Sequence, residues 1–176
     1  MLINHHRTFA PVPPKGWNSW DGYGASVREE EVRKNAEYMS KHLKQLGWEY
    51  IVVDIQWYEP TANSSRYHDL LPDPGRFPSA SGGRGFKPLA DYVHSLGLKF
   101  GIHIMRGIPR QAVHQATAIK GSDKSAREIA RNNICPWNSD MYGVNMAIPE
   151  GQLYYNSLMD LYASWGVDFV KCDDIA

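Results

Sequence analysis

Helical and strand-like patterns alternate along this chain, and a glycine closes each predicted helix before the next strand begins. A helix that ends at glycine is a common arrangement because glycine adopts the left-handed conformation freely. Right-handed crossovers then place the strands parallel and adjacent in one sheet. The predicted strands are 15–21, 48–54, 98–104 and 166–174, and the predicted helices are 27–46, 86–96 and 149–165.

Local sequence features support these elements. The strand at 48–54 is almost entirely apolar, which is typical of a strand covered on both faces. Ser26 is predicted to cap the first helix, with Glu29 as its capping-box partner. Pro149 is predicted to begin the third helix at its first position. The first helix carries its apolar residues at helical spacing, at Val32, Ala36, Met39, Leu43 and Leu46.

This order predicts an α/β fold of the TIM-barrel type, (β/α)₈, of which the chain holds only the first four βα units. A complete barrel takes about 250 residues, and this chain has 176. No linker or shift in composition divides it, so residues 1–176 are expected to form one domain, the N-terminal half of a barrel. No G-x-G-x-x-G motif follows the first strand, which argues against a dinucleotide-binding domain.

Two long connections, 55–85 and 105–148, interrupt the pattern, and loops of this length commonly carry function. The second is predicted to hold a short helix near 124–131. Its segment Cys135–Asn138 either forms a pocket wall or has only a structural role that holds the loop in place. Residues 1–13 are predicted to be an extended lead-in stiffened by prolines.

The composition is that of an ordinary globular protein, with 43% hydrophobic and 22% charged residues and a formal net charge of zero. No basic region suggests nucleic acid, and no apolar run reaches membrane-spanning length. The first seven residues lack the apolar stretch of a signal peptide, which predicts a cytoplasmic protein. Two cysteines form no metal pattern, and reduced thiols are expected, with a single bridge left open. No cofactor is expected.

Polar and aromatic side chains cluster where the predicted strands end. In a parallel barrel these points converge on one face. Carboxylates accept hydrogen bonds from hydroxyls, lysine donates them, and tryptophan packs against a ring, so a neutral, hydroxyl-rich ligand is expected. The alternatives are that the acids cap a helix or are solvated, and that the aromatics fill the core. The residues are Trp20, Asp21, Asp54, Trp57, His103, Arg106, Lys171, Asp173 and Asp174.

Five ordered blocks of this sequence resemble glycoside hydrolase family 27, the α-galactosidase and α-N-acetylgalactosaminidase family. Together they cover the chain from about Pro14 to Asp174, which makes the resemblance specific at the level of the family. The blocks are Gly16–Trp20, the strand ending in Asp54 with Trp57 after it, Arg76–Pro78, Tyr92–Ile102, and Trp165–Asp168 continued through Lys171–Asp173.

The resemblance implies a retaining exo-glycosidase on a (β/α)₈ barrel that uses no metal. It implies that Asp173 is the nucleophile and that Lys171 binds sugar hydroxyls. It also implies that Trp20 packs against the sugar and that Asp54 binds hydroxyls on its C4/C6 side. The family's acid/base Asp comes from a later strand, so this chain alone is expected to be inactive. Asp174 is a poor candidate for that acid, because adjacent strand residues point to opposite faces.

Two positions depart from the family pattern. Ile55 replaces the second Asp of a pair, and His103 stands where tyrosine is common. A site that hydrogen-bonds a hydroxyl discriminates strongly for it, so Ile55 suggests a less polar sugar such as β-L-arabinopyranose. His103 is otherwise a hydrogen-bonded structural residue. Arg106 and Arg110 reach a distal substrate group or are simply solvated.

Two functions therefore remain open. The first is the glycosidase just described, acting on α-galactosyl, α-N-acetylgalactosaminyl or β-L-arabinopyranosyl residues. The second is a non-catalytic carbohydrate-binding or structural half-barrel. Four parallel strands leave two exposed sheet edges, and pairing of two copies would cover them, so a homodimer is a further expectation.

Overall fold

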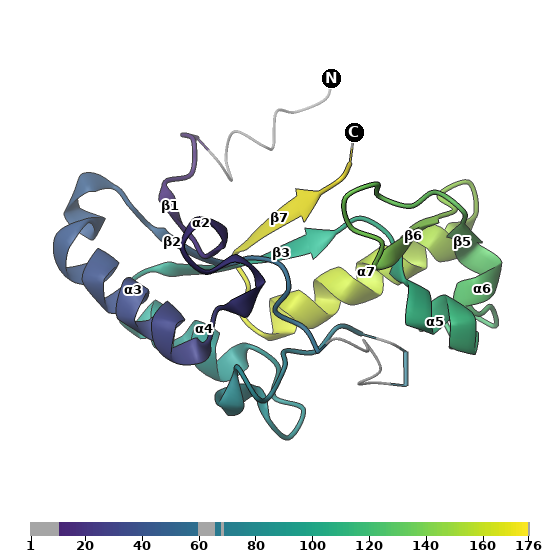
Figure 1. The fold of residues 1–176 in the computed structure, drawn as a ribbon, viewed down its shortest axis with the longest axis horizontal. Coiled ribbons are helices and arrows are strands. Elements are labelled where there is room, and N and C mark those ends of the chain that lie inside the picture. Colours follow the sequence, from purple (N-terminus) through teal and green to yellow (C-terminus); the bar gives the residue numbers. More distant parts are fainter. Residues whose placement is uncertain (1–10, 60–65, 68, 176) are drawn as a thin grey trace.

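The centre of the protein is a four-stranded, entirely parallel sheet with the order β1-β2-β3-β7 (Figure 1). The structure is a computed structural model that describes residues 11–59, 66–67 and 69–175. The predicted order of strands and helices and their parallel arrangement are confirmed. The strands are β1 (Gly16–Asn18), β2 (Tyr50–Val53), β3 (Lys99–Met105) and β7 (Phe169–Asp173).

Three crossover helices lie along one face of this sheet (Figure 1). They are α3 (Glu29–His42), α4 (Lys87–Ser95) and α7 (Pro149–Ser164). The strands turn alternate residues toward these helices, and Ile51, Val53, Phe100 and Ile102 are fully buried there. The opposite face therefore receives the other set of side chains, which includes His103 of β3 and Lys171 of β7, paired directly across the ladder.

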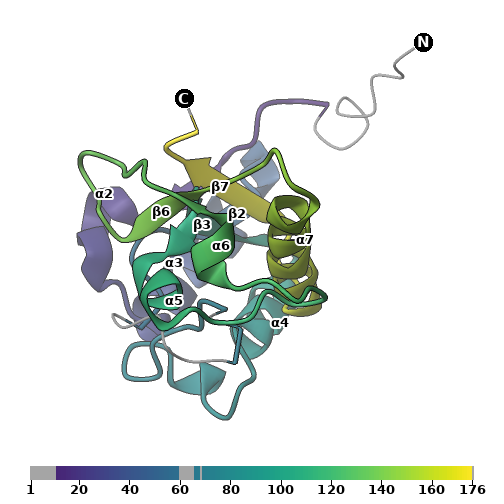
Figure 2. The same cartoon turned by 90° about the vertical axis from the view of Figure 1, so that its right-hand side faces the viewer.

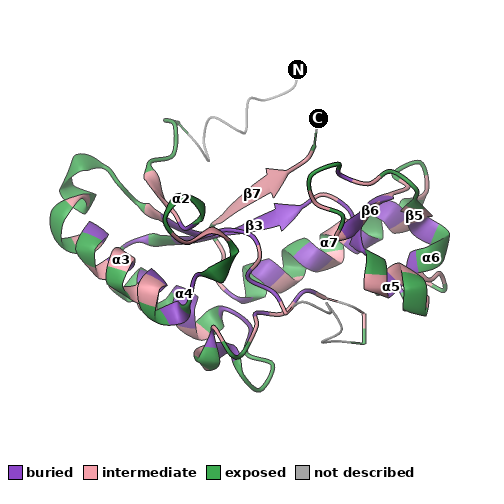
Figure 3. Cartoon of the chain, in the orientation of Figure 1, coloured by how far each residue is buried: buried purple, intermediate pink, exposed green. Residues whose placement is uncertain are grey.

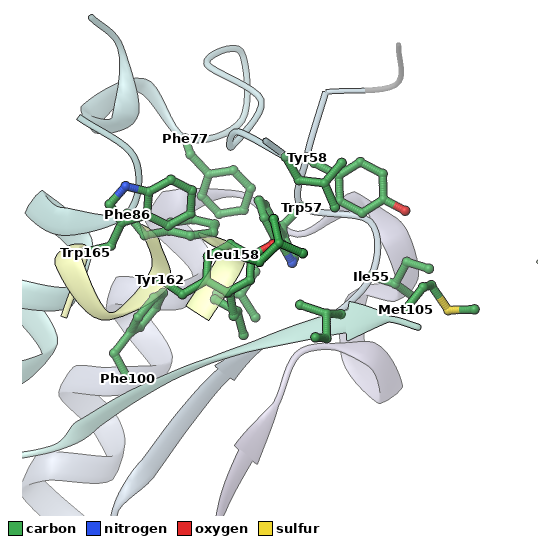
Figure 4. Packing of buried hydrophobic residues seen from close by; sticks show 14 of the residues in the cluster. Ile55, Trp57, Tyr58, Phe77, Phe86, Phe100, Met105, Leu158, Tyr162 and Trp165 are labelled. Carbon is green, nitrogen blue, oxygen red and sulfur yellow. The ribbon is translucent and has the colours of Figure 1, made fainter. Parts of the chain in front are cut away.

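An aromatic cluster fills the space between the sheet and the helices (Figure 4). The Trp57 ring lies edge-on to Phe86 at a centroid distance of 5.2 Å and to Tyr162 at 6.2 Å. Gly85 lets the loop approach Trp165 closely. A Cβ at Gly85 would lie 2.1 Å from the Trp165 ring, and its φ of +56° is one that glycine tolerates best.

The connection after β3 folds into a small module that the sequence did not predict in full. A three-stranded antiparallel sheet of order β4-β6-β5 lies there with two short helices, beyond the arrowhead of β3 in Figures 1 and 2. Its elements are β4 (Ile108–Pro109), α5 (Arg110–Gln115), α6 (Ala126–Ile129), β5 (Ala130–Arg131) and β6 (Met141–Val144). Only α6 corresponds to a prediction, because strands of two residues (β4 and β5) or four residues (β6) are too short to produce a readable period.

Several predicted boundaries were wrong. β1 ends at Asn18, and the residues after Ser19 form the short helix α2 (Trp20–Tyr23) followed by the 3₁₀ turn η1 (Gly24–Ser26). Ser26 does not cap α3, since its hydroxyl donates to the carbonyl of Tyr23. The capping contact at the N-terminus of α3 is instead made by Glu31, whose carboxylate accepts a hydrogen bond from the backbone N–H of Arg28 at 2.7 Å.

Other connections are also short turns. The predicted first helix closes with the 3₁₀ turn η2 (Lys44–Leu46), and η3 (Pro78–Ala80) lies in the connection after β2. Residues 1–10 of the predicted lead-in lie outside the described residues. Both cysteines are free thiols. Within the described ranges, no helix has the length and apolar character needed to cross a bilayer.

Candidate active site

Four ionisable side chains meet at the carboxyl ends of β2, β3 and β7. The ladder pairs Val53 with Ile102 and His103 with Lys171, so Asp54, which follows Val53, lies level with both. Asp173 lies two residues beyond Lys171 and therefore on the same face of β7. The parallel register thus brings residues separated by more than a hundred positions into one group.

Asp54 is the buried anion of this group. Its side chain accepts a hydrogen bond from Asn18 Nδ2 at 2.6 Å and from Lys171 Nζ at 2.9 Å, and its second oxygen accepts the N–H of Ile55 at 2.8 Å. Burial acts to raise the pKa of Asp54, but the bonds from Asn18 and Lys171 and the nearby His103 outweigh it and lower the pKa below its ordinary value. Asp54 is therefore an ionised hydrogen-bond acceptor.

Asp173 and Lys171 are the more open members of the group. Lys171 Nζ lies 3.7 Å from Asp173 Oδ2, and the two side chains are 41% and 38% exposed. The carboxylate of Asp173 can therefore be reached by a ligand while a cation stays close to it. A carboxylate in this position can act as a nucleophile.

His103 lies beneath Asp173 and is completely buried. Its Nε2 is 3.1 Å from Asp173 Oδ2. Burial lowers the pKa of His103 below its ordinary value of 6.5, although Asp54 and Asp173 act in the opposite direction. The ring is thus a neutral hydrogen-bonding group in contact with the exposed carboxylate.

The prediction that Trp57 contacts a sugar was wrong. Its ring is fully buried among the core aromatics, and its Nε1 donates to the main-chain carbonyl of His103 at 2.6 Å. Trp57 follows β2 by only four residues, but the chain there turns back into the core. Its indole therefore supports β3 from the helix side of the sheet.

The remaining predicted residues surround the group at different depths. Trp20 is 47% exposed on α2, and its backbone N–H donates to Asn18 Oδ1 at 2.8 Å, which places it next to the Asp54 partner. Asp21 is exposed on α2 and makes no hydrogen bond to the group. Ile55 is only 6% exposed and belongs to the hydrophobic core, so it can offer a sugar little direct contact.

Arg106 is engaged by Asp174, with Nη2 2.9 Å from Oδ2 and Nε donating to the Asp174 carbonyl at 2.6 Å. Asp174 has a φ of +59°, and its carboxylate is paired with Arg106. This pairing accounts for Arg106 without a substrate, and it removes Asp174 from the group as the sequence predicted. Of the predicted residues, the structure therefore brings together Asp54, His103, Lys171 and Asp173.

Sequence reasoning missed two contributors. Asn18 bridges Asp54 and the start of α2, and its only signal was its place inside the first block. Asp140 links the connection 105–148 to the connection 55–85. Its Oδ2 accepts hydrogen bonds from Tyr58 Oη at 2.7 Å and from Gln56 Nε2 at 3.0 Å. No sequence pattern links residues more than eighty positions apart in loops. Within the described part of the chain, no three His, Cys, Asp or Glu side chains are grouped to bind a metal ion.

A family model described as alpha galactosidase A matches residues 12–148. The chain belongs to this family, glycoside hydrolase family 27. An α-galactosidase of Cyamopsis tetragonoloba is 33% identical over 164 residues, covering 93% of this chain and 30% of the relative. The family comprises glycoside hydrolases, as the resemblance implied.

Two solved structures are more similar in sequence. A Bacillus halodurans protein assigned as an α-N-acetylgalactosaminidase is 66% identical with a TM-score of 0.90, over 94% of this chain and 41% of that one. A β-L-arabinopyranosidase of Geobacillus stearothermophilus is 64% identical with a TM-score of 0.93, over 97% of this chain and 42% of that one. The chain thus spans about a third to two fifths of the length of these relatives.

Proposed function

We propose that this chain forms the first four βα units of the (β/α)₈ barrel of a retaining exo-glycosidase. Its substrates would be terminal α-galactosyl or related residues, including α-N-acetylgalactosaminyl and β-L-arabinopyranosyl groups. The observation that carries the proposal is the exposed carboxylate of Asp173 at the mouth of β7, with Lys171 3.7 Å away and His103 3.1 Å away. Membership of the family supports the reaction class.

Asp173 would act as the nucleophile. Its carboxylate attacks the anomeric carbon while the bond from that carbon to the departing oxygen breaks, and the departing oxygen takes a proton from a second carboxylic acid. Water then hydrolyses the glycosyl ester. In retaining enzymes the two carboxyl groups lie about 5–5.5 Å apart.

Neither neighbouring acid in this chain suits the role of proton donor. Asp54 is held ionised by Asn18 and Lys171, and the carboxylate of Asp174 is paired with Arg106. The donor would therefore come from an element beyond these four units, and the 176 residues alone would be inactive. Activity belongs to the complete barrel on this proposal.

The remaining polar groups would bind the sugar. Asp54 accepts hydrogen bonds and Lys171 donates them, so both suit hydroxyl groups, and the exposed face of Trp20 suits the apolar side of the ring. The family pattern has a carboxylate at the position of Ile55, so this chain offers a sugar one hydrogen-bond acceptor fewer beside Asp54. This favours a pentopyranose such as β-L-arabinopyranose, which lacks the hydroxymethyl group of galactose.

The test is hydrolysis of nitrophenyl α-galactoside, α-N-acetylgalactosaminide and β-L-arabinopyranoside by the protein of the complete reading frame and by the isolated 176 residues. We expect turnover by the first and none by the second, and Asp173→Asn should abolish turnover. Hydrolysis by the isolated chain, or activity that survives Asp173→Asn, would overturn the proposal.

A second candidate is a non-catalytic half-barrel that binds carbohydrate as a homodimer. β7 lies at the edge of the sheet, and all five of its residues are only half-buried. Another strand or a second copy could pair there. Light scattering that shows a dimer, together with sugar binding but no turnover in the complete protein, would favour this candidate over the enzyme.

A further inference from the structure

We infer that His103 is a positioning residue that holds Oδ2 of Asp173 and so leaves Oδ1 as the oxygen that attacks the sugar. The inference rests on the proposed function, because it assumes that Asp173 is the nucleophile. It adds which of the two oxygens reacts and which side chain makes the choice.

Both neighbours of the Asp173 carboxylate approach the same oxygen. His103 Nε2 lies 3.1 Å from Oδ2 and Lys171 Nζ lies 3.7 Å from it. Of these, only the His103 distance is that of a hydrogen bond. Within the described residues Oδ1 has no hydrogen-bond partner, and the side chain is 38% exposed. The two oxygens are therefore unequal before any ligand arrives.

The surroundings of His103 determine which nitrogen carries the proton. An ionised carboxylate only accepts hydrogen bonds, so Nε2 must donate to Asp173. Nδ1 is buried and has no partner, so a proton there would have no acceptor. The charged groups that face the ring are Asp54 from the end of β2, and Lys171 and Asp173 from β7. The ring is thus a neutral donor with its proton on Nε2.

His103 is also held firmly in place. It lies in β3, between β2 and β7, and pairs with Lys171 across the ladder. Its carbonyl accepts the indole N–H of Trp57 at 2.6 Å from the other side of the sheet, and its own side chain is fully buried. The donor therefore cannot swing away from Asp173 without breaking packing on both faces.

A neutral donor on Oδ2 suits both states of a covalent cycle. When Oδ1 bonds to the anomeric carbon, the carboxylate loses its charge and Oδ2 becomes the carbonyl oxygen of the ester. The departing sugar oxygen takes its proton from the barrel's carboxylic acid, and water later returns the carboxylate. An N–H can donate to Oδ2 throughout, so the same bond orients the carboxylate in the free enzyme and in the intermediate.

Two substitutions of His103 by amide side chains, glutamine and asparagine, provide a matched test in the complete protein. The amide nitrogen of His103→Gln reaches the position of Nε2, whereas that of His103→Asn reaches the position of Nδ1. We expect His103→Gln to lower kcat by no more than about tenfold. His103→Asn and His103→Leu should lower it by about 100-fold, with KM changed by less than about threefold.

Equal losses in the Gln and Asn variants would overturn the inference, since a purely structural role would not distinguish the two amides. The Asp173→Asn variant is the control for the proposed function. If Asp173→Asn stays active, Asp173 is not the nucleophile and the proposed function is wrong. If Asp173→Asn is inactive but His103→Gln and His103→Asn lower kcat equally, only the role of His103 is wrong.

A second measurement does not depend on the variants folding. Nitrogen-15 chemical shifts of His103 in the wild-type protein at neutral pH should show a protonated Nε2 and a bare Nδ1. A proton on Nδ1 would overturn the inference whatever the kinetics show.

Discussion

The two faces of the central sheet differ sharply although they share the same strands. On the helix side, Trp57, Phe86 and Tyr162 pack edge to face in a buried aromatic cluster. On the other side, Asp54 and Lys171 form a charged group at the strand ends. Figure 3 shows a second contrast within the sheet, because the central strand β3 is buried after Lys99 whereas the edge strand β7 is half-buried.

The aromatic face therefore contributes mainly to the stability of the fold, and the charged face carries the groups suited to chemistry. Aromatic burial stabilises the fold and is indifferent to pH, whereas the charged face is held by hydrogen bonds that each depend on a partner's ionisation. The two faces meet at His103, whose carbonyl bonds to Trp57 and whose ring contacts Asp173. Substitutions in the aromatic cluster should therefore mainly lower stability, whereas substitution of the exposed Asp173 should mainly lower activity.

The largest expected effect is on activity. Asp173→Asn in the complete protein should lower kcat by a factor on the order of 10⁴, because it removes the attacking charge. The free energy of unfolding should change by less than about 1 kcal/mol, since the side chain is partly exposed. Hydrolysis assays and urea unfolding would measure the two. A large loss of stability would show that the two faces are not separable.

Trp57→Ala should have the opposite profile. Truncation of this buried ring should lower the free energy of unfolding by about 3–5 kcal/mol, because it leaves a cavity in the aromatic cluster. Trp57→Phe is the matched control, since it keeps a ring and removes only the indole N–H that bonds to His103. Urea unfolding of both variants should show the smaller loss for Phe, and equal losses would mean that the hydrogen bond matters more than the packing.

Lys171→Met should cost about 1–2 kcal/mol of stability, because Asp54 loses one of its hydrogen bonds while Asn18 remains. The partial exposure of Lys171 keeps the effect small. Combining it with Asp54→Asn gives a double-mutant cycle, in which the second substitution should cost less than it does alone. Additive losses would show that the two side chains do not interact.

The smallest expected effect is a dependence of stability on pH. The pKa of His103 is lowered in the folded state, so below about 6.5 the unfolded chain binds a proton that the folded chain does not. Stability should therefore fall as the pH falls from about 6.5 toward the folded-state pKa. Asp54, Lys171 and Asp173 are the charged groups that face the ring. Thermal unfolding of His103→Gln should lack this slope, and an unchanged slope would assign it to another group.

Much of the site could be predicted because the ends of buried strands can be recognised in the sequence. The abrupt change from apolar to charged residues located Asp54, Lys171 and Asp173, and parallel topology implied that they converge. Trp57 was misplaced because a tryptophan just past a strand end has no periodic context to show which face it takes. Asn18 and Asp140 act through contacts between distant segments, which no local pattern encodes.

The fold boundaries show the same limit. Gly97 marked the end of α4 because positive φ is a local property of the backbone, whereas Gly47 closes the 3₁₀ turn η2 and α3 already ends at His42. The capping box at Ser26 failed because a short turn, η1, occupies those residues and moves the helix start to Glu29. The strands β4, β5 and β6 are stabilised by pairing across their module, and segments of two to four residues carry little propensity of their own.

The position of β7 at the end of the strand order also fixes when the charged group can be completed during synthesis. Synthesis runs from the N-terminus, so β1, β2 and β3 leave the ribosome before β7. A sheet of these three strands alone would have an unpaired edge at β3, and Asp54 would lack the ammonium group of Lys171. Pairing of β7 with β3 supplies both, so we expect the fourth strand and the charged group to form in the same step.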